Sequence, residues 1–308
     1  MGLTLIEASK LNPGDVIKNS IIELYAGSSD ILMNLPFESI NGNALKYNRE
    51  GALPGVGFRG VNEAYTASTG ILNPLTEALV IAGGDLDVDK FIIDTMGANQ
   101  RSVHEAMKVR ALSLAWTAKF FNGDNQSDAR EFDGLKVRIT GNQKIAAGST
   151  GGGDPLSLAK LDQAIDQTLN PTHLIMSKAM KRRMTQASRN YSVGGFITFT
   201  QDAFGRPVEL YNNLPILTVD LDNTETAILP FTEATTSGGA TGTSIYVVSF
   251  TDGMFTGIQN GSIDVRDLGE LQTSPLFRTR VEWYNGIAIF HGRAATRLCA
   301  ISDAAVVV

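Results

Sequence analysis

The sequence predicts an α+β fold in which a second, α/β unit interrupts the first. Three observations support this prediction. Extended segments and one long helical segment occupy the chain before residue 150. Helical and strand-like segments then alternate from 155 to 253, and the chain after 261 is almost entirely strand-like. Strands on both sides of an alternating unit are typical of a domain that receives another by insertion.

The composition excludes several classes of protein. Charged residues make up 19% of the 308 residues, against about 25% in a typical soluble domain. The net charge of −6 argues against a general nucleic-acid wrapper. No apolar stretch approaches a membrane span, so we expect no membrane association, and the single Cys299 excludes a disulfide scaffold. The low charge leaves two interpretations, a large core or a surface that other subunits bury.

The first 72 residues combine an amphipathic start with a long hairpin. Residues 3–35 favour helix in two pieces, broken at Asn12-Pro13-Gly14, and form either an arm on a neighbour or a peripheral helix. Residues 38–50 and 55–68 are expected to be the two extended arms of a hairpin with few large apolar side chains. A two-stranded hairpin is marginal alone, so either a neighbouring subunit supports it or it is a loose surface loop.

A strand and a long helix follow the hairpin. The strand is expected over 74–84, ending in two glycines. Asp85, Asp87, Asp89 and Asp94 come next; a metal site is one interpretation, but a helix cap at Asp87 or Asp89 is favoured. The helix is predicted to reach about residue 121 with a kink near Gly97. Its apolar face is predicted from helical spacing and contains Val103, Met107, Leu114, Ala118 and Phe121.

The inserted unit is expected after a flexible joint at 148–153, a glycine-rich run that does not match a phosphate-binding loop. Before the joint, 132–145 has turn and strand character. Within the unit, the pattern predicts a helix over 158–169, a buried strand over 173–176 and a basic helix from Ser177. Further strands are predicted over 195–199, 208–211, 216–219, 226–229 and 245–250.

The closing segment is predicted to be mostly strand. Its longest strand covers 276–289, where Asn285-Gly286 predicts a bulge or bend. Cys299 lies in an apolar run, which favours a buried structural thiol over a nucleophile.

The sequence offers little catalytic chemistry. The three histidines, His104, His173 and His291, have no second ligand at metal-binding spacing. No HExxH, GxSxG, Walker A or CxxC motif is present, so we expect no catalytic, cofactor or metal site. The basic helix over 178–189 favours a solvated or salt-bridged face over a nucleic-acid contact. An enzyme built on the α/β unit remains an alternative, with His173 and His291 as the residues to test.

The order of these features resembles the major capsid protein of tailed bacteriophages, which has the Hong Kong 97 fold. The most specific stretch is residues 277–298, FRTRVEWYNGIAIFHGRAATRL, which is similar to the closing segment of one branch of such proteins. Leu35-Pro36-Phe37 and Asn41-Gly42-Asn43 are similar to that branch as well. The resemblance covers nearly the whole chain.

The resemblance implies a division of the chain. Residues 1–37 would be an N-terminal arm and 38–72 the extended loop. Residues 73–150 and 255–285 would form the peripheral domain with its spine helix. The axial domain would take 151–254 and 286–308.

The resemblance also implies a structural role and not an enzyme. Copies of the chain would form hexamers and pentamers of an icosahedral shell that encloses double-stranded DNA, contacted loosely on the interior. Scaffold, portal and decoration proteins would be further partners, and the protein would belong to the virion, assembled in the host cytoplasm. An encapsulin, a cellular compartment with a similar fold, is the alternative.

The hairpin carries the residues expected to contact other subunits. Charge pairing would set the register between copies, and the candidates are Lys46, Arg49, Glu50, Arg59 and Glu63. Lys46 is the one lysine of the hairpin, but nothing in the sequence names a partner for a covalent crosslink.

Overall fold

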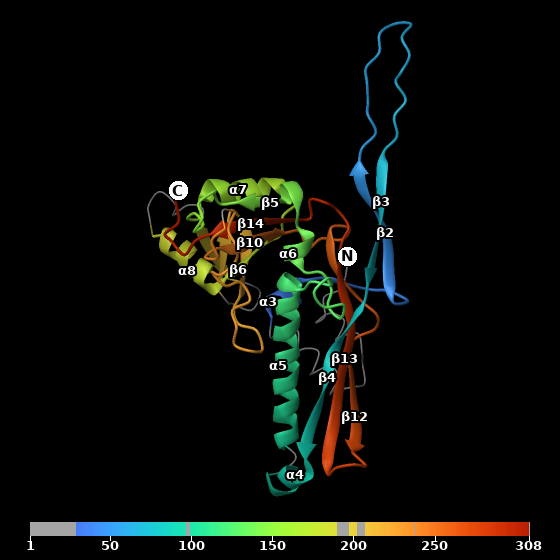
Figure 1. Ribbon diagram of the computed structural model, residues 1–308, viewed down its shortest axis with the longest axis vertical. Helices are drawn as coiled ribbons and strands as arrows, with labels where there is room; N and C mark the ends of the chain where they lie inside the picture. Colours follow the sequence, from blue (N-terminus) through green and yellow to red (C-terminus); the bar gives the residue numbers. More distant parts are fainter. Residues whose placement is uncertain (1–28, 97–98, 190–196, 202–206, 237, 308) are drawn as a thin grey trace.

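The computed structural model describes residues 29–96, 99–189, 197–201, 207–236 and 238–307. The helical prediction for 3–35 therefore lies outside the described residues up to residue 28, and its last part contains the short helix Asp30–Asn34. The kink at Gly97 lies outside the described residues as well. Within the described residues, the strands form a five-stranded, a seven-stranded and a two-stranded sheet. Figure 1 shows a helix-covered body, a long helix beside a narrow sheet, and a hairpin that projects beyond both.

The five-stranded sheet is built around one long strand, β13 (Leu276–Ile289). It pairs along one side with β4 and along the other with β11 and then β12, all antiparallel. β1 adds in parallel to β11. The bounds of these partners are β1 (Phe37–Ser39), β4 (Val80–Asp89), β11 (Phe255–Gln259) and β12 (Asp264–Glu270).

The predicted bulge at Asn285-Gly286 is wrong. The register of β13 passes through both residues without a shift, and the irregularity of this sheet lies in β12, between Asp267 and Gly269. Gly286 is needed for close packing: a Cβ there would lie 3.2 Å from the Ile258 side chain and 3.3 Å from the Ala78 carbonyl oxygen. The strand therefore uses the glycine to let two neighbours approach.

The strand predicted to end at two glycines continues past them. Gly83 and Gly84 lie inside β4, and a Cβ on Gly83 would lie 2.4 Å from the Val281 carbonyl oxygen. The glycines thus allow β4 to pair closely with β13. The strand ends at Asp89, whose Oδ1 accepts a hydrogen bond from Phe91 N at 2.8 Å. The predicted cap at Asp89 is confirmed.

The long helix lies along one face of the five-stranded sheet (Figure 1). α4 (Lys90–Met96) precedes it, and α5 (Asn99–Asn122) has 24 residues, which at 1.5 Å per residue span about 36 Å. The buried positions of α5 are Val109, Ser113, Trp116, Thr117, Phe120 and Phe121. The predicted face is therefore wrong in its first half, since Val103 and Met107 are exposed by 53% and 62%.

The seven-stranded sheet has the order β5-β14-β10-β6-β9-β8-β7 and carries α7 and α8. Helix and strand alternate as predicted only from α7 through β6 to α8; the described residues after α8 form four successive strands, β7 to β10, with no helix between them. The strand predicted over 226–229 is absent; that stretch forms turns around one bridge between Leu221 and Ala227. The strand bounds are β5 (Lys144–Ala146), β6 (His173–Ser177), β7 (Ile197–Gln201), β8 (Pro207–Tyr211), β9 (Leu214–Val219), β10 (Thr243–Val248) and β14 (Ala295–Ile301). The helices are α7 (Leu158–Gln167) and α8 (Lys178–Ala187).

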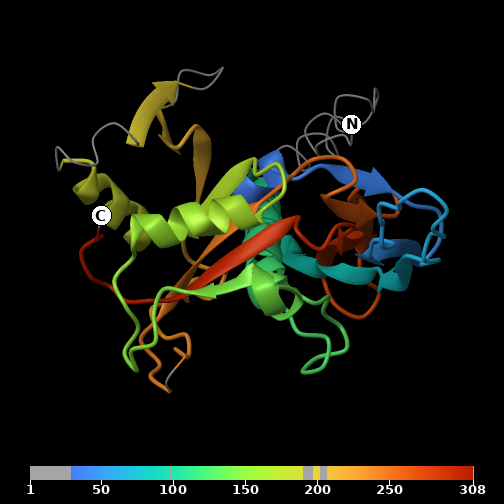
Figure 2. The same ribbon diagram turned by 90° about the horizontal axis from the view of Figure 1, so that it is seen from above.

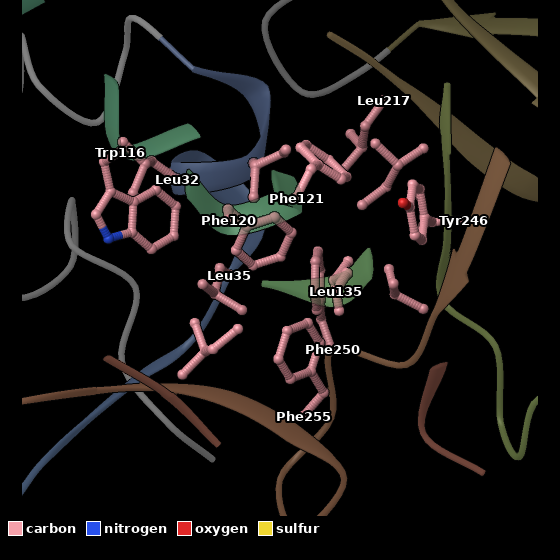
Figure 3. Close-up of a cluster of buried hydrophobic side chains, with 14 of the residues drawn as sticks. Leu32, Leu35, Trp116, Phe120, Phe121, Leu135, Leu217, Tyr246, Phe250 and Phe255 are labelled. Atoms are coloured by element: carbon pink, nitrogen blue, oxygen red, sulfur yellow. The ribbon is translucent and has the colours of Figure 1, made fainter. Parts of the chain in front are cut away.

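One hydrophobic core joins the two larger sheets. It collects side chains from α5, from both sheets and from the short helices α3 (Asp30–Asn34) and α6 (Leu135–Arg138). Figure 3 shows Phe120 and Phe121 of α5 near its centre, with Trp116 on one side, Tyr246 on the other and Leu135 below them. A second core lies between the seven-stranded sheet and α7 and α8. The view from above shows α7 lying across that sheet (Figure 2).

Candidate assembly interface

The most conspicuous surface feature is the projecting hairpin of β2 (Ala44–Ala52) and β3 (Ile71–Ala78) (Figure 1). Its register runs from Ala44 opposite Ala78 to Ala52 opposite Ile71. The tip, residues 53–70, contains no strand. The arms therefore differ from the prediction of 38–50 and 55–68. Residues 37–39 pair with β11 in the body, and Pro74 is tolerated inside β3 because this edge strand has no third partner there.

The tip is more apolar than the sequence interpretation allowed. Seven large hydrophobic side chains in and beside it are at least 58% exposed. Phe58 is fully exposed, and Val56 and Val61 are exposed by 90% and 93%. The other four are Leu53, Tyr65, Ile71 and Leu72. Contiguous apolar surface of this kind marks a contact with another protein.

Arg59 and Glu63, two of the predicted contact residues, lie together at the tip. The Glu63 carboxylate accepts from Gly60 N at 2.8 Å, and Arg59 Nη1 donates to the Glu63 carbonyl oxygen at 3.3 Å. The Arg59 guanidinium also lies 5.1 Å from the centre of the Tyr65 ring. These bonds shape the turn and leave both charged groups at the surface.

Lys46, Arg49 and Glu50, the other three predicted contact residues, lie on β2 and are not brought to the tip. Side chains alternate along a strand, so Lys46 and Glu50 are exposed on one face while Arg49 faces the body. Arg49 lines a small cavity of about 90 Å³ together with Arg138 and Gln143. That these residues contact other subunits stays a prediction.

The base of the hairpin is fixed to the body by an ion pair that the sequence did not indicate. Arg138 of α6 donates from Nη1 and Nη2 to the two carboxylate oxygens of Glu77 at 2.5 and 2.7 Å. The hydroxyl of Tyr47 contacts Glu77 Oε1 at 3.2 Å and the Ile289 carbonyl oxygen at 3.1 Å. Burial is the largest cause that raises the pKa of Tyr47 to about 12, with the Glu77 charge second. Both side chains of the ion pair are largely shielded from solvent.

A second apolar surface lies beside the long helix. Residues of β4, including Val80, Ile81 and Ala82, line a groove of about 240 Å³ together with Leu112, Ala115 and Trp116 of α5 and with Phe132. Ile81 is 70% exposed, and Met107 continues the apolar surface along α5. Periodicity alone missed this surface because it assumes that apolar residues of a helix face the core of their own chain.

Two aspartates of β4 form ion pairs with arginines of the neighbouring strand β13. Asp87 accepts from Arg278 Nε at 2.6 Å, and Asp85 accepts from Arg280 Nε at 2.7 Å. These arginine bonds are the largest cause lowering the pKa of both carboxyl groups. Asp85, Asp87 and Asp89 are thus each engaged in pairing or capping, and the residues that the structure describes contain no cluster able to hold a metal ion.

The remaining candidate groups are bound into the fold. His173 packs against Phe250, with ring centres 5.4 Å apart, and His291 Nδ1 accepts from Arg293 N in the turn before β14. Cys299 is buried in β14, as predicted. In the basic helix α8, Lys178 pairs with Asp220 and Arg183 pairs with Asp303, in agreement with a salt-bridged face.

Comparisons with known proteins identify the fold. No model of a known protein family and no curated protein matches the sequence. Among solved structures, the holo-SrpI encapsulin complex from Synechococcus elongatus matches with a TM-score of 0.64 at 14% identity, over 100% of this chain and 99% of that chain.

Phage-like particles match as well. The capsid of a native GTA particle gives a TM-score of 0.60 at 14% identity, over 89% of this chain and 91% of that chain. A structure from Mycobacterium phage Bobi matches with a TM-score of 0.61 at 14% identity, over 90% of this chain and 91% of that chain. Within the described residues, no helix has the length and apolar character of a membrane span. The described architecture, with its projecting hairpin, long helix and two sheets, is the Hong Kong 97 fold, and the resemblance found in the sequence is confirmed at the level of fold.

Proposed function

We propose that this chain is a major capsid protein that assembles into hexamers and pentamers of an icosahedral shell around packaged double-stranded DNA. The observation that carries the proposal is the hairpin, which exposes seven large apolar side chains in and beside its tip and leaves them uncovered by the described part of the chain. The proteins of similar fold include a capsid and an encapsulin, which are shells. The role is structural, with the virion as its location and the host cytoplasm as the place of assembly.

The surface area supports burial by other copies. The chain exposes 16581 Å², about a third more than the roughly 12,500 Å² expected of a compact monomer of this mass. The tip and the groove between β4 and α5 both contribute apolar surface to that excess. A tip of one copy covering apolar surface of the next removes both from water. Lys46, Arg49, Glu50, Arg59 and Glu63 then set the register by charge pairing.

The parts of the chain take the roles expected from the fold. Residues 1–37 serve as the arm and 38–72 as the extended loop, 73–150 and 255–285 as the peripheral domain, and 151–254 with 286–308 as the axial domain. Support comes from sheet membership: β4, β11 and β12 share one sheet, whereas β6 to β10 and β14 share the other. The short strands β1 and β5 cross this division and tie the parts together.

The test replaces residues 53–70 with Asn-Gly. Ala52 and Ile71 are opposite each other in the register, and Asn-Gly favours a two-residue hairpin turn, so β2 and β3 keep their pairing. We expect circular dichroism and the unfolding midpoint to be unchanged while shells are lost. A control, Thr66→Ser, keeps a hydroxyl group at this tip position and should still assemble. Shells formed by the shortened chain would refute the role of the tip.

An encapsulin-type compartment is the second candidate. The observation that favours it is the match to an encapsulin over essentially the full length of both chains. The two candidates differ in content, since one shell holds DNA and the other a protein cargo. Particles purified from the native source and treated with nuclease should retain DNA if the first proposal is right. Particles that hold protein and no DNA would favour the encapsulin, and the contents would also reveal scaffold, portal or decoration proteins.

A further inference from the structure

The hairpin touches the body on one face and only near its base. The partly buried residues of its two strands are Ala44, Leu45, Tyr47, Arg49, Leu75 and Glu77, whereas both strands are exposed further out. The Tyr47 ring packs edge-on against Phe290, with centres 4.9 Å apart. Glu77 receives both arms of the Arg138 guanidinium. Everything that orients the hairpin therefore lies within a few residues of its origin.

The backbone connections below these contacts are short. β3 passes into β4 through the single residue Leu79, and β1 passes into β2 through 40–43. Gly42 adopts a φ of +115°, which favours glycine. Leu79 N donates to the Asn43 carbonyl oxygen and joins the two connections, and Asn260 Nδ2 donates to the Gly42 carbonyl oxygen and ties the first of them to the body after β11. Such connections resist separation of the strands but offer few contacts against a tilt of the whole hairpin.

Arg138 is itself held in place by the body. Its Nε donates to the Asp133 carbonyl oxygen at 2.5 Å, and α6 is anchored by Leu135, which is fully buried in the main core. The neighbouring Lys136 carbonyl accepts from Arg297 of β14, at 3.5 Å, and Arg297 forms a buried ion pair with Glu233. Tyr47 reaches the end of β13 through the Ile289 carbonyl. The hairpin is thus connected to both large sheets. α6, which carries Arg138, contacts the seven-stranded sheet, and Tyr47 contacts the five-stranded sheet.

We infer that Glu77, Arg138 and Tyr47 form a latch that sets the angle at which the hairpin leaves the body. A bidentate arginine–carboxylate pair fixes geometry as well as adding energy, and this one is 13% and 17% exposed, so water screens it weakly. None of the five residues proposed to contact other copies belongs to the latch. Its residues act by positioning the hairpin.

A small change of the tilt angle at the latch produces a large displacement of the tip. β3 rises about 3.3 Å per residue, so the six steps from Glu77 to Ile71 cover about 20 Å. A tilt of about 10° at the base moves the end of β3 by about 3.5 Å, one residue of strand register, and moves the tip further. On the proposed function, the latch therefore decides where the tip meets the next copy, and so the curvature of the shell.

The latch is tested in the full-length chain, first as single subunits at low concentration. Amide hydrogen exchange is followed over 44–52 and 71–78 in wild type, Glu77→Ala and Tyr47→Phe. We expect exchange there to rise about tenfold or more in Glu77→Ala, the factor given by losing a charge-assisted hydrogen bond. Tyr47→Phe keeps the ring against Phe290 and should give a smaller rise.

The matched control is Glu270→Ala, which removes an exposed ion pair with Lys90 at the far end of the sheet (Figure 1). It should leave exchange in the hairpin unchanged. Hairpin exchange in Glu77→Ala equal to that of this control would overturn the latch. This measurement is made on single subunits and needs no assembly. If the wild type never formed shells, the proposed function would be refuted, but the exchange result for the latch would still hold.

The consequence for curvature is tested on assembled material. Glu77→Ala should give particles with a broader or shifted diameter distribution, whereas Glu270→Ala should match the wild type. Faster hairpin exchange combined with particles of unchanged diameter would show that the ion pair holds the hairpin without setting the geometry of assembly, and would refute that part of the inference.

Discussion

At the scale of single residues, the core depends on a polar contact. Trp116 of α5 donates from Nε1 to Asn285 Oδ1 at 2.9 Å, and Asn285 donates back to the Trp283 carbonyl at 3.2 Å. Both side chains are buried. The sequence suggested a bulge or bend at Asn285-Gly286, because Asn-Gly interrupts regular structure. It could not show that an indole from 169 positions away would satisfy the amide.

We predict that Asn285→Ala destabilises the chain by about 2–4 kcal/mol, because it leaves a buried indole N–H without a partner and removes side-chain volume. Urea unfolding of the unassembled chain measures the loss. Trp116→Phe removes the same hydrogen bond from the other side, so the double variant should cost clearly less than the sum of the two. Strict additivity would show that the bond contributes nothing.

His173 gives the fold a dependence on pH. Burial alone lowers its pKa from 6.5 to about 4, so the folded chain favours the neutral ring. The unfolded chain binds a proton below about pH 6.5, and this stabilising contribution is therefore complete above that pH and lost as pH falls towards 4. The full loss is on the order of 3 kcal/mol.

We predict that His173→Gln shows a flatter dependence of unfolding free energy on pH between 6.5 and 4 than the wild type. The substitution removes the titrating ring, while titrations elsewhere stay common to both chains. Urea midpoints measured at half-unit steps test this. Parallel curves for the two chains would mean that His173 does not contribute.

At the scale of elements, the N-terminal strand β1 is held by a tight aromatic contact. Phe37 lies 5.2 Å from the Trp283 ring centre and 6.1 Å from that of Trp116. It covers Gly257 of β11 so closely that a Cβ there would lie 2.3 Å from the Phe37 ring. Phe37 is buried between the two indoles, so it has little room to move aside.

We expect Gly257→Ala to destabilise the fold by about 1–3 kcal/mol, the usual cost of overpacking a core. Thermal unfolding measures it. Gly261→Ala is the comparison for backbone effects, because Gly261 has open space around its Cβ position but a φ of +74°. If Phe37→Leu in addition to Gly257→Ala fails to recover stability, the clash with the ring is not the cause.

Elements buried in the chain's own core were predictable, and elements that serve a surface were not. The apolar runs of β6, β10 and β14 are buried as their sequences indicate. The hairpin limits and the face of α5 were wrong because residues such as Phe58 and Met107 are apolar yet exposed. The described part of the chain does not cover them, and hydrophobic periodicity places apolar residues in the chain's own core, so it misplaces these two.

At the scale of the whole molecule, the low charge acquires a physical explanation. A chain with 19% charged residues and about a third more surface than a compact monomer leaves much weakly charged surface in water. Exposed apolar side chains at the tip, on β4 and on α5 add to it. Composition alone left two explanations of the low charge, a large core and a surface buried by other subunits. The structure contains two hydrophobic cores, and the proposed function adds the buried surface.

The candidate contact residues illustrate what remains a proposal. Arg59 and Glu63 lie at the tip and Lys46, Arg49 and Glu50 on β2, so any contact they make involves two different regions of a neighbour. Arg138 and Glu77 had no signal in the sequence, since they are 61 positions apart and only the fold brings them together.

Cryo-electron microscopy of the purified full-length chain tests the central claim most directly. We predict closed icosahedral particles in which density for the tip of one copy, residues 53–70, lies against apolar surface of an adjacent copy. Monodisperse single subunits across a wide range of protein and salt concentrations, or particles whose tips extend into solvent without contact, would contradict the account.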